Sequence, residues 1–372
     1  MALTIPEDIK RNATPKCSHF GECGGCSLQD VTYEEQLLFK RNILTEMLGR
    51  EIEVVGSPAQ YGFRHRMDFA TAFGKVGLRK KGDAKSLVNL GECHVVKDRI
   101  SKLIPKIQAW IEEFGVRGFN FITKKGDIRF VTFRHAISSD QLMIIVVTKS
   151  KETKVAPLIE KLKGEAETVI WSVQERIGDD SHGAVQEAYG MKLLNQKIGN
   201  FEFVISPGCF FQNNLVLADQ LFEEISGFVS GYTMDLFCGT GTIGIYTSGN
   251  ATEVVGVEIM EENIRLAELN ASNNNVSNIK FVLDNANHYL AHYEGPRPDT
   301  VILDPPRSGL APKFIRKINR LRAENLVYVS CNPKTYVNDL QLLEAYKLES
   351  IKAFDMFPQT PHVEIVSQLK LK

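Results

Sequence analysis

The sequence predicts an α/β protein in which a mostly parallel C-terminal sheet is preceded by a smaller α+β domain. Three observations lead to this prediction. From residue 232 onward, short apolar segments rich in β-branched residues alternate with segments of helical periodicity. A glycine-rich turn follows the first of these strands and opens a helix. The last two strands are separated by a proline-containing turn, which predicts an antiparallel hairpin at the edge of the sheet.

The composition is that of an ordinary globular protein. The chain has 372 residues and is 43% hydrophobic and 24% charged. Its net charge of −1 gives no global attraction to nucleic acid, so such a partner would need a local basic patch. The longest apolar runs, such as residues 142–147, are too short to cross a membrane, and residues 1–16 lack the apolar stretch of a signal peptide. We therefore expect a reducing, cytoplasmic environment in which the seven cysteines do not form disulfides.

Residues 1–50 are expected to form a cysteine-containing segment followed by a helix. Cys17, Cys23 and Cys26 are grouped in this segment, and Cys93 lies far along the chain. Four thiolates can hold one [4Fe–4S] cluster or one tetrahedral zinc ion. Zinc sites more often use two paired Cys-x-x-Cys motifs, so the spacing favours the cluster, with zinc as the alternative.

Residues 51–204 are expected to form a mixed α+β domain. The alternating segments that predict its strands are 63–73, 127–136, 141–148 and 168–175, and those that predict its helices are 100–114 and 155–163. Basic and apolar residues alternate from Tyr61 to Phe69, which places the basic side chains on one face of a strand. A solvated sheet face explains this pattern, but with aromatic residues close by the same face can bind RNA phosphates and bases.

Residues 205–372 are expected to form the second domain. The predicted strands are 232–237, 253–259, 279–285, 299–304, 325–331, 348–357 and 362–371. The predicted helices between them are 262–274, 286–292, 313–322 and 335–345. Five βα units closed by an antiparallel hairpin form the strand order of a seven-stranded, Rossmann-like methyltransferase sheet.

The first βα turn of this domain predicts a nucleotide-like ligand. It runs from Asp235 to Gly244, and its glycines let the backbone approach a ligand closely. Glu258 ends the next strand, where a carboxylate can bind ribose hydroxyls, and Asp284 ends the third strand, where a side chain can meet an adenine edge. A dinucleotide-binding enzyme would show the same features. The sequence Asp304-Pro-Pro after the fourth strand is instead typical of a methyltransferase that uses S-adenosylmethionine.

Cys331 and Glu364 are the candidate reacting groups. Cys331 ends the fifth strand, and Asn332-Pro333 stop that strand and leave the thiol at the rim of the sheet. The alternative for Cys331 is a buried packing role, and the alternative for Glu364 is a solvated charge on an edge strand. A cysteine that attacks a ring carbon and a carboxylate that removes a proton are the two groups that methylation of a pyrimidine at C5 requires.

Seven motifs make the chain similar to the RNA uracil-C5-methyltransferases of the iron–sulfur ribosomal type. They are CSHFGECGGCSLQ, YGFRHRMDFA, SPGCFFQNN, DLFCGTGTIG, DPPRSGL, SCNP and DMFPQTPHVE, and they span nearly the whole chain. The resemblance implies that Cys331 is the nucleophile and Glu364 the base. It also implies that S-adenosylmethionine is held by Gln212, Phe237, Glu258 and Asp304. Finally, it implies a [4Fe–4S] cluster on Cys17, Cys23, Cys26 and Cys93.

The chain departs from many members of this family at its N-terminal end. Only 16 residues precede Cys17, so we expect the OB-like RNA-binding domain of those members to be absent. The shorter subgroup that lacks it implies methylation of one uridine at C5 in 23S ribosomal RNA by a monomer, with tRNA as the alternative substrate. Two other functions are an iron–sulfur protein that binds RNA without catalysis and an amino-group methyltransferase. The latter places an aromatic residue after Asp-Pro-Pro, where this chain has Arg307.

Overall fold

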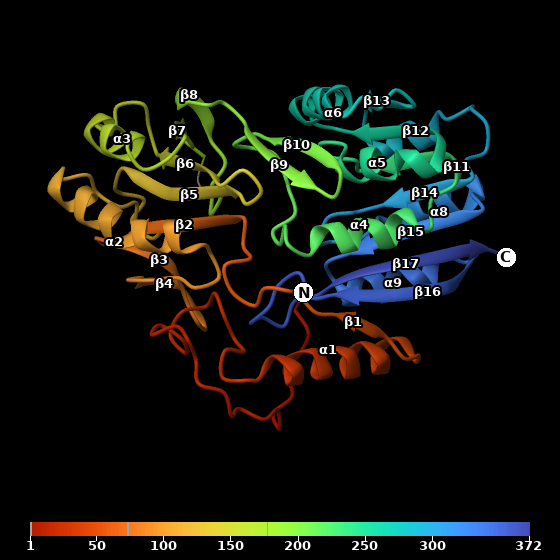
Figure 1. Ribbon diagram of the computed structural model, residues 1–372, viewed down its shortest axis with the longest axis horizontal. Coiled ribbons are helices and arrows are strands. Elements are labelled where there is room, and N and C mark those ends of the chain that lie inside the picture. Colours follow the sequence, from red (N-terminus) through yellow and green to blue (C-terminus); the bar gives the residue numbers. More distant parts are fainter. Residues whose placement is uncertain (1, 73, 177) are drawn as a thin grey trace.

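The computed structural model describes residues 2–72, 74–176 and 178–372. It contains one eight-stranded sheet, one seven-stranded sheet and a two-stranded hairpin, and the hairpin lies between the two large sheets (Figure 1). Residue 73, at the end of the predicted strand 63–73, lies outside the described residues. None of the described helices is long and apolar enough to cross a membrane.

The eight-stranded sheet contains all seven strands that were predicted for the C-terminal domain. Its order is β1-β16-β17-β15-β14-β11-β12-β13. The parallel strands are β11 (Gly231–Leu236), β12 (Ala251–Glu258), β13 (Ile279–Leu283), β14 (Thr300–Leu303) and β15 (Asn325–Ser330). The antiparallel strand β17 (Glu364–Leu371) lies between β15 and β16 (Tyr346–Phe354).

The prediction of seven strands is wrong by one. The short strand β1 (Glu53–Val55) pairs in parallel with β16 and forms the edge of this sheet. It lies in the range that was predicted for the preceding α+β domain. A three-residue strand shows too little alternation to be recognised, and its partner lies near the other end of the chain, so no local pattern predicts the pairing.

Helices cover both faces of this sheet. Apolar residues of α4 (Ala218–Ser226), α5 (Thr242–Thr247) and α6 (Glu261–Asn273) pack on one face. Residues of α7 (Ala286–Ala291), α8 (Pro312–Leu321) and α9 (Pro333–Leu342) pack on the other. Along β14, Ile302 points to the first face and Val301 and Leu303 to the second, as expected because successive side chains of a strand point to opposite faces.

Helix α1 (Tyr33–Leu48) also packs on the second face, where Phe39 and Leu44 join the apolar core. Thr32 caps its first turn, and Gly49 ends it with a left-handed φ of 64°. Lys40 of α1 forms an ion pair of 2.7 Å with Asp355, and both side chains are fully buried. Removing one partner of such a buried pair typically costs about 3–5 kcal/mol, so α1 is firmly attached to the loop that follows β16.

The seven-stranded sheet forms the core of the central α+β region. Its order is β4-β3-β2-β5-β6-β7-β8. The strands are β2 (Arg66–Ala72), β3 (Lys75–Lys80), β4 (Asp83–Asn89), β5 (Ile128–Ala136), β6 (Gln141–Thr148), β7 (Thr168–Val173) and β8 (Ala184–Gly190). Helices α2 (Asp98–Glu113) and α3 (Ala156–Lys163) pack on it, close to their predicted positions.

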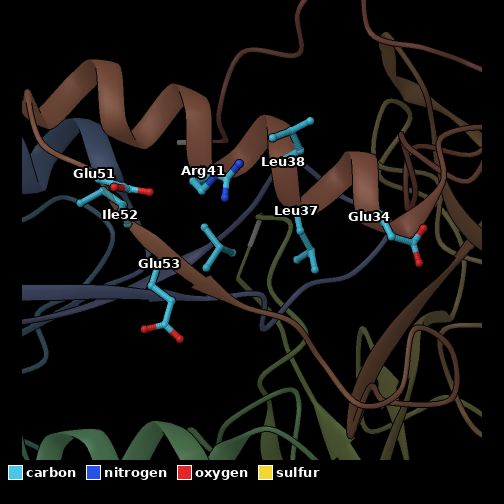
Figure 2. A pocket seen from close by; sticks show the side chains of 8 residues that line it. Glu34, Leu37, Leu38, Arg41, Glu51, Ile52 and Glu53 are labelled. Atoms are coloured by element: carbon cyan, nitrogen blue, oxygen red, sulfur yellow. The ribbon is translucent and has the colours of Figure 1, made fainter.

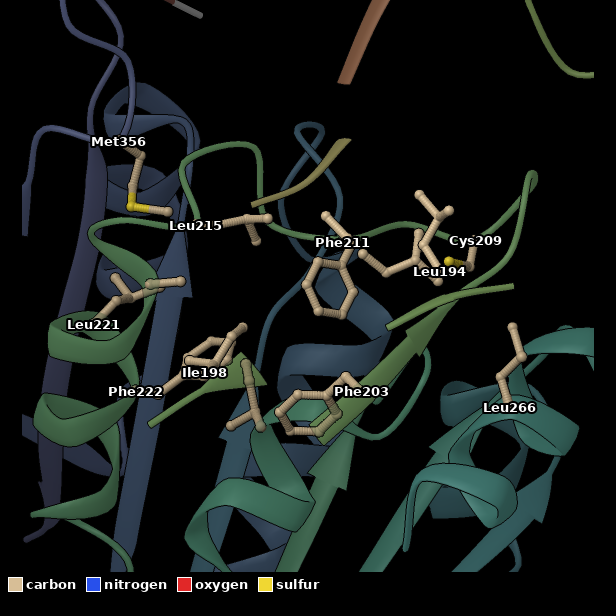
Figure 3. Close-up of a cluster of buried hydrophobic side chains, with 14 of the residues drawn as sticks. Leu194, Ile198, Phe203, Cys209, Phe211, Leu215, Leu221, Phe222, Leu266 and Met356 are labelled. Carbon is tan, nitrogen blue, oxygen red and sulfur yellow. The ribbon is translucent and has the colours of Figure 1, made fainter. Parts of the chain in front are cut away.

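The hairpin formed by β9 (Leu194–Ile198) and β10 (Phe201–Ile205) joins the two halves of the molecule. Its apolar side chains share one core with the strands of both large sheets. Figure 3 shows Phe203 beside Phe211 in this core, with Phe222 of α4 close to Ile198 of the hairpin. The predicted boundary at residue 204 therefore falls at the end of a hairpin that packs against both halves.

A groove lies between α1 and β1, on the side of the eight-stranded sheet (Figure 2). Its charged side chains are Glu34, Glu51 and Glu53, with Arg41 as the one cation among the residues that line it. Three carboxylates against one guanidinium would repel phosphate groups. This groove is therefore unsuited to binding nucleic acid.

Candidate active site

The register of two neighbouring strands brings Cys331 and Glu364 together. Strand β15 pairs antiparallel with β17, and the last pair is Ser330 with Ile365. Cys331 directly follows Ser330 and Glu364 directly precedes Ile365, so both lie next to this last pair. They are close enough for the negative charge of Glu364 to raise the pKa of Cys331. The two predicted reacting groups therefore lie side by side at the carboxyl end of the parallel strands, where α/β sheets bind ligands.

Both groups titrate abnormally because of their surroundings. Burial raises the pKa of the Cys331 thiol to about 11, with a further contribution from the negative charge of Glu364. Only 5% of Glu364 is exposed, and burial, followed by repulsion from Asp304, raises its pKa well above the usual value. Burial also raises the pKa of Asp304 to about 7. Glu364 is thus a buried carboxyl group beside a sulfur, and not the solvated edge charge that was the alternative.

Arg307 is the cation of this site. Its positive charge lowers the pKa values of both Cys331 and Glu364, in opposition to the effect of burial. Asn332 holds the Arg307 main chain in place, because its side-chain nitrogen donates a hydrogen bond of 2.8 Å to the Arg307 carbonyl. The Arg307 side chain is exposed and can contact a substrate. The Asp-Pro-Pro-Arg turn and the turn after β15 are thereby linked to each other.

The conformation of the first βα turn lets a ligand approach its main chain closely. Both oxygens of Glu258 accept main-chain hydrogen bonds, from Gly239 at 3.1 Å and Met260 at 2.8 Å. Phe237 adopts a φ of 74°, which is unusual for a residue other than glycine. A Cβ atom at Gly241 would lie 2.9 Å from the ring of Phe281, so only glycine fits there. Glu258 and Phe237 both lie at this turn, and their contact with a cofactor stays a prediction.

Large apolar side chains near this turn are exposed, and a role for them was not predicted from the sequence. Ile259 and Met260, directly after Glu258, are 63% and 56% exposed, and Leu283, directly before Asp284, is 50% exposed. Exposed apolar groups beside two carboxylates suit a ligand that combines a ribose with a flat base. In the sequence, these residues could have been recognised as bulky apolar residues directly beside the carboxylates Glu258 and Asp284 at the ends of predicted strands.

Asp284 and Gln212 have different surroundings. Asp284 accepts a hydrogen bond of 2.9 Å from Nδ1 of His288, so it is already engaged by a neighbouring side chain. Gln212 is half-buried on the loop between β10 and α4. This loop is anchored to the central sheet, because the main-chain nitrogen of His65 donates to the Asn213 carbonyl at 2.8 Å. A contact of Asp284 or Gln212 with the cofactor stays a prediction.

Phe210, two residues before Gln212, is an exposed aromatic residue. Phe210 is 63% exposed, whereas the adjacent Phe211 is buried in the core that the β9–β10 hairpin shares. A large apolar ring that is turned to solvent is suited to stack on a base. In the sequence the two phenylalanines are equivalent, and only the fold distinguishes them.

The four predicted cluster cysteines line one pocket. Its walls also include the apolar side chains Phe20, Leu78, Leu90 and Val95. Burial, together with repulsion between neighbouring thiolates, raises the pKa of Cys26 to about 11 and that of Cys93 to about 12. Four thiols facing one another in an apolar pocket would be stabilised as thiolates only by a bound cation.

Among the described residues, no group of three or more His, Cys, Asp or Glu side chains is arranged to hold a metal ion. The four cysteines nevertheless line one pocket with apolar walls, and both the cluster and its zinc alternative stay predictions. Cys209 and Cys238 are buried elsewhere in the structure.

The basic residues of the central sheet are partly paired within the protein. Arg66 at the start of β2 contacts Asp68 at 3.1 Å, and Arg79 of β3 contacts Asp179 at 2.9 Å. Arg79 also lies over the ring of Phe121, at 4.4 Å from its centroid. Alternation along β2 is confirmed, since Met67 and Phe69 are buried while Arg66 and Asp68 are partly exposed. RNA binding by this face stays a prediction.

Comparisons with known proteins place this geometry in context. The family model described as tRNA (Uracil-5-)-methyltransferase matches residues 32–372. A tRNA (uracil(54)-C(5))-methyltransferase of Pyrococcus horikoshii is 38% identical over 355 residues, which cover 95% of this chain and 85% of the relative. A 23S rRNA (uracil(747)-C(5))-methyltransferase of Pyrococcus abyssi is 34% identical over 359 residues, again covering 95% of this chain and 85% of the relative.

A solved structure is similar over nearly the whole chain. It is the crystal structure of Pyrococcus abyssi tRNA (uracil-54, C5)-methyltransferase in complex with S-adenosyl-L-homocysteine. Its TM-score is 0.82 at 33% identity, and the match covers 93% of this chain and 86% of that chain. The α/β fold with its two mixed sheets is therefore shared with that protein.

Proposed function

The chain belongs to the tRNA (uracil-5-)-methyltransferase family, and we propose that it methylates one uridine of a structured RNA at C5 with Cys331 as nucleophile and Glu364 as base. The observation that carries the proposal is the strand register that brings Cys331 and Glu364 to the same end of β15 and β17, close to Asp304 and Arg307. An amino-group methyltransferase would have no use for this pair, and a protein that only binds RNA would not need to bury a carboxyl group beside a thiol.

The chemistry follows from the electronic structure of uracil. The C5–C6 double bond is a weak nucleophile, so C5 does not take up a methyl group unaided. The Cys331 sulfur, after loss of its proton, forms a bond to C6 and turns C5 into an enolate carbon. Once C5 carries the methyl group, Glu364 accepts the C5 proton, the C5–C6 double bond re-forms and the carbon–sulfur bond breaks. The cysteine is thereby regenerated, and the proton leaves on the carboxylate.

The methyl donor is expected to be S-adenosylmethionine, which supplies an electrophilic methyl group. Glu258 would hold the ribose, and Phe237 and the glycine-rich turn would line the donor site. Asp304 lies near both parts of the site, since its negative charge raises the pKa of Asp235 in the glycine-rich turn and the pKa of Glu364. Gln212 and Asp284 complete the set of residues proposed for this site.

The RNA must present its uridine outside the base stack. Cys331 lies at the ends of strands, where a base paired within a helix cannot reach the sulfur, so the target base is flipped out or already in a loop. The exposed ring of Phe210 and the exposed guanidinium of Arg307 are suited to hold the flipped base and its phosphate. The basic residues of β2 and β3 would extend the RNA contact.

The RNA substrate is tested by offering both candidates to the enzyme. A tRNA with uridine 54 and a 23S rRNA fragment with uridine 747 are the candidates, because relatives of similar identity are named for each. We expect 5-methyluridine in one of the two after incubation with S-adenosylmethionine, located by mass mapping of nuclease fragments. A matching transcript with cytidine at the target position is the control. Methylation of neither RNA would contradict both assignments, and methylated adenine or guanine would contradict the proposed reaction.

We further propose that Cys17, Cys23, Cys26 and Cys93 hold a [4Fe–4S] cluster, because all four line the same apolar pocket. Protein purified without oxygen is expected to be brown and to contain about four irons and four sulfides per chain. Cys93→Ser should lose iron as completely as Cys23→Ser, since both thiols face the pocket. Cys331→Ser, outside the pocket, should retain it. Stoichiometric zinc without sulfide would overturn the cluster.

A further inference from the structure

One residue of the loop between β16 and β17 has an uncommon main-chain conformation. Gln359 has a φ of 67°, in the left-handed region that residues other than glycine seldom adopt, and it is only 2% exposed. Such a conformation costs about 1–3 kcal/mol and persists only where surrounding contacts enforce it. The loop that contains Gln359 leads directly into Glu364, the first residue of β17.

The contacts that enforce this conformation come from the other end of the chain. Gln36 of α1 is fully buried, and its Oε1 accepts a hydrogen bond of 3.0 Å from the main-chain nitrogen of Gln359. The side-chain nitrogen of Gln36 donates to Oε1 of Gln359, also at 3.0 Å. The main-chain nitrogens of Ser27 and Leu28 both donate to the Gln359 carbonyl, at 2.9 Å and 3.2 Å. The main-chain nitrogen, the main-chain carbonyl and the side-chain Oε1 of Gln359 are therefore all held.

Gln36 also contacts the N-terminal segment whose residues Ser27 and Leu28 bind the Gln359 carbonyl. Its side-chain nitrogen lies 2.9 Å from the Leu28 carbonyl and 3.0 Å from the Val31 carbonyl. Ser27 and Leu28 follow directly after Cys26, which lines the four-cysteine pocket. The N-terminal cysteine segment, helix α1 and the loop before Glu364 thus meet at a single amide side chain.

We propose that Gln36 is a positioning residue for Glu364, acting through the main chain of Gln359. The inference rests on the proposed function, in which Glu364 removes the C5 proton. Loss of the Gln36 amide would leave the buried main-chain nitrogen of Gln359 without a partner. Only the bonds from Ser27 and Leu28 to its carbonyl would then restrain its left-handed φ. The main chain from Thr360 to Glu364 would then change its conformation. The carboxyl group of Glu364 would move away from the C5 proton of the bound uracil.

The proposed role predicts that loss of Gln36 slows proton removal and product release, and not the attack of Cys331 on C6. Cys331 follows β15, which none of the contacts of Gln36 touches, so attack on C6 should continue. Proton removal requires Glu364, so release of the methylated RNA should slow. A variant that merely loosened the fold would instead lower attack and release together. The ratio of covalent complex to product therefore separates positioning from general stability.

The experiment compares four variants of the full-length protein on ordinary substrate RNA with S-adenosylmethionine. Gln36→Met keeps the volume but removes every hydrogen bond of the amide. Gln359→Gly keeps the main-chain bonds and adopts a positive φ without cost. Arg11→Ala removes a partly exposed ion pair of the same N-terminal segment, with Asp30. Glu364→Gln is the reference for a lost base. Covalent complex is measured on denaturing gels during a single turnover, together with methyl transfer.

We expect Gln36→Met to slow release about tenfold, the equivalent of one or two buried hydrogen bonds, with the attack rate retained. Gln359→Gly and Arg11→Ala should release RNA within about threefold of the wild type. Equal loss of attack and release in Gln36→Met, or unchanged release, would overturn the positioning role. If Glu364→Gln itself accumulates no complex, the base assignment fails, and the positioning role fails with it. If covalent complex accumulates with Glu364→Gln but not with Gln36→Met, the positioning role of Gln36 is refuted and the assignment of Glu364 as the base still stands.

Discussion

Replacing Cys331 by alanine or serine is expected to abolish the covalent complex between the protein and its RNA, and to lower methylation by at least about 10³-fold. Without the thiolate, C5 of uracil is not nucleophilic enough to take the methyl group. The complex is best observed with RNA that contains 5-fluorouridine, because fluorine at C5 cannot leave as a proton and the reaction stops at the adduct. Wild-type protein should give a band of retarded mobility on a denaturing gel only when S-adenosylmethionine is present.

The two Cys331 variants require evidence that they are folded, which unchanged binding of S-adenosylmethionine provides. The pH gives a second test on the wild type. Burial raises the pKa of the Cys331 thiol to about 11, so the neutral thiol dominates at pH 7 and the thiolate fraction increases with pH. Adduct formation should therefore accelerate by about tenfold per pH unit between about pH 6 and 9. An adduct in Cys331→Ala would contradict the nucleophile assignment.

Replacing Glu364 by glutamine is expected to stop turnover after methylation. The amide has the size of the carboxyl group but cannot accept the C5 proton, so the methylated uridine stays bonded to Cys331. Covalent complex should accumulate on ordinary RNA, and turnover should fall by about 10²-fold or more. The measurement is a denaturing gel with RNA labelled in its backbone, combined with a count of methyl groups per complex. Turnover at the wild-type rate would show that Glu364 has no role in catalysis.

The same variant should be more stable than the wild type at high pH. Burial raises the pKa of Glu364 above its value in the unfolded chain. A group of this kind stabilises the folded state fully only below its unfolded pKa, about 4.3, and this contribution is lost as the pH rises. Glu364→Gln should therefore melt at a higher temperature than the wild type at pH 8, and the difference should shrink towards pH 4. A difference that grows on acidification would contradict the direction of the shift.

The elements that the sequence predicted share a strong local pattern. Strands β11 to β15 are apolar, β-branched and separated by helices, so their periodicity indicates both their type and their parallel order. Strand β8 was not predicted because its residues, from Ala184 to Gly190, are mostly exposed and show no apolar alternation. Strand β1 has three residues and depends on a partner in β16. Such strands form because a neighbour offers free main-chain groups, which no local pattern records.

In the candidate site, too, some features could be predicted from the sequence and others depend on the fold. The residue types at Cys331, Glu364 and Asp304 indicate the chemistry, and their places at strand ends indicate a common edge. Their proximity, however, depends on the antiparallel register of β15 and β17. The contact between Gln36 and Gln359 joins residues 323 positions apart, and neither residue stands out in the sequence. Phe210 was missed because the fold alone decides which of two adjacent phenylalanines faces the solvent.

The four cysteines illustrate what structure adds to a motif. Their spacing favoured a cluster over zinc, and the fold brings all four to one apolar pocket, although Cys93 is remote in sequence. It also places the residues after Cys26 against the loop that leads to Glu364. The cysteine segment therefore contacts the loop that precedes the proposed base. Iron and sulfide analysis decides what occupies the pocket.

Release of hydrogen from C5 tests the central claim most directly. Substrate RNA is prepared with tritium at C5 of its uridines, and tritium in water is counted alongside methyl groups transferred from S-adenosylmethionine. Because C5 must lose its hydrogen once it carries the methyl group, one tritium should appear for each methyl group, and none with Cys331→Ala. Methyl transfer without release of tritium would place the methyl group on another atom and contradict the proposed reaction.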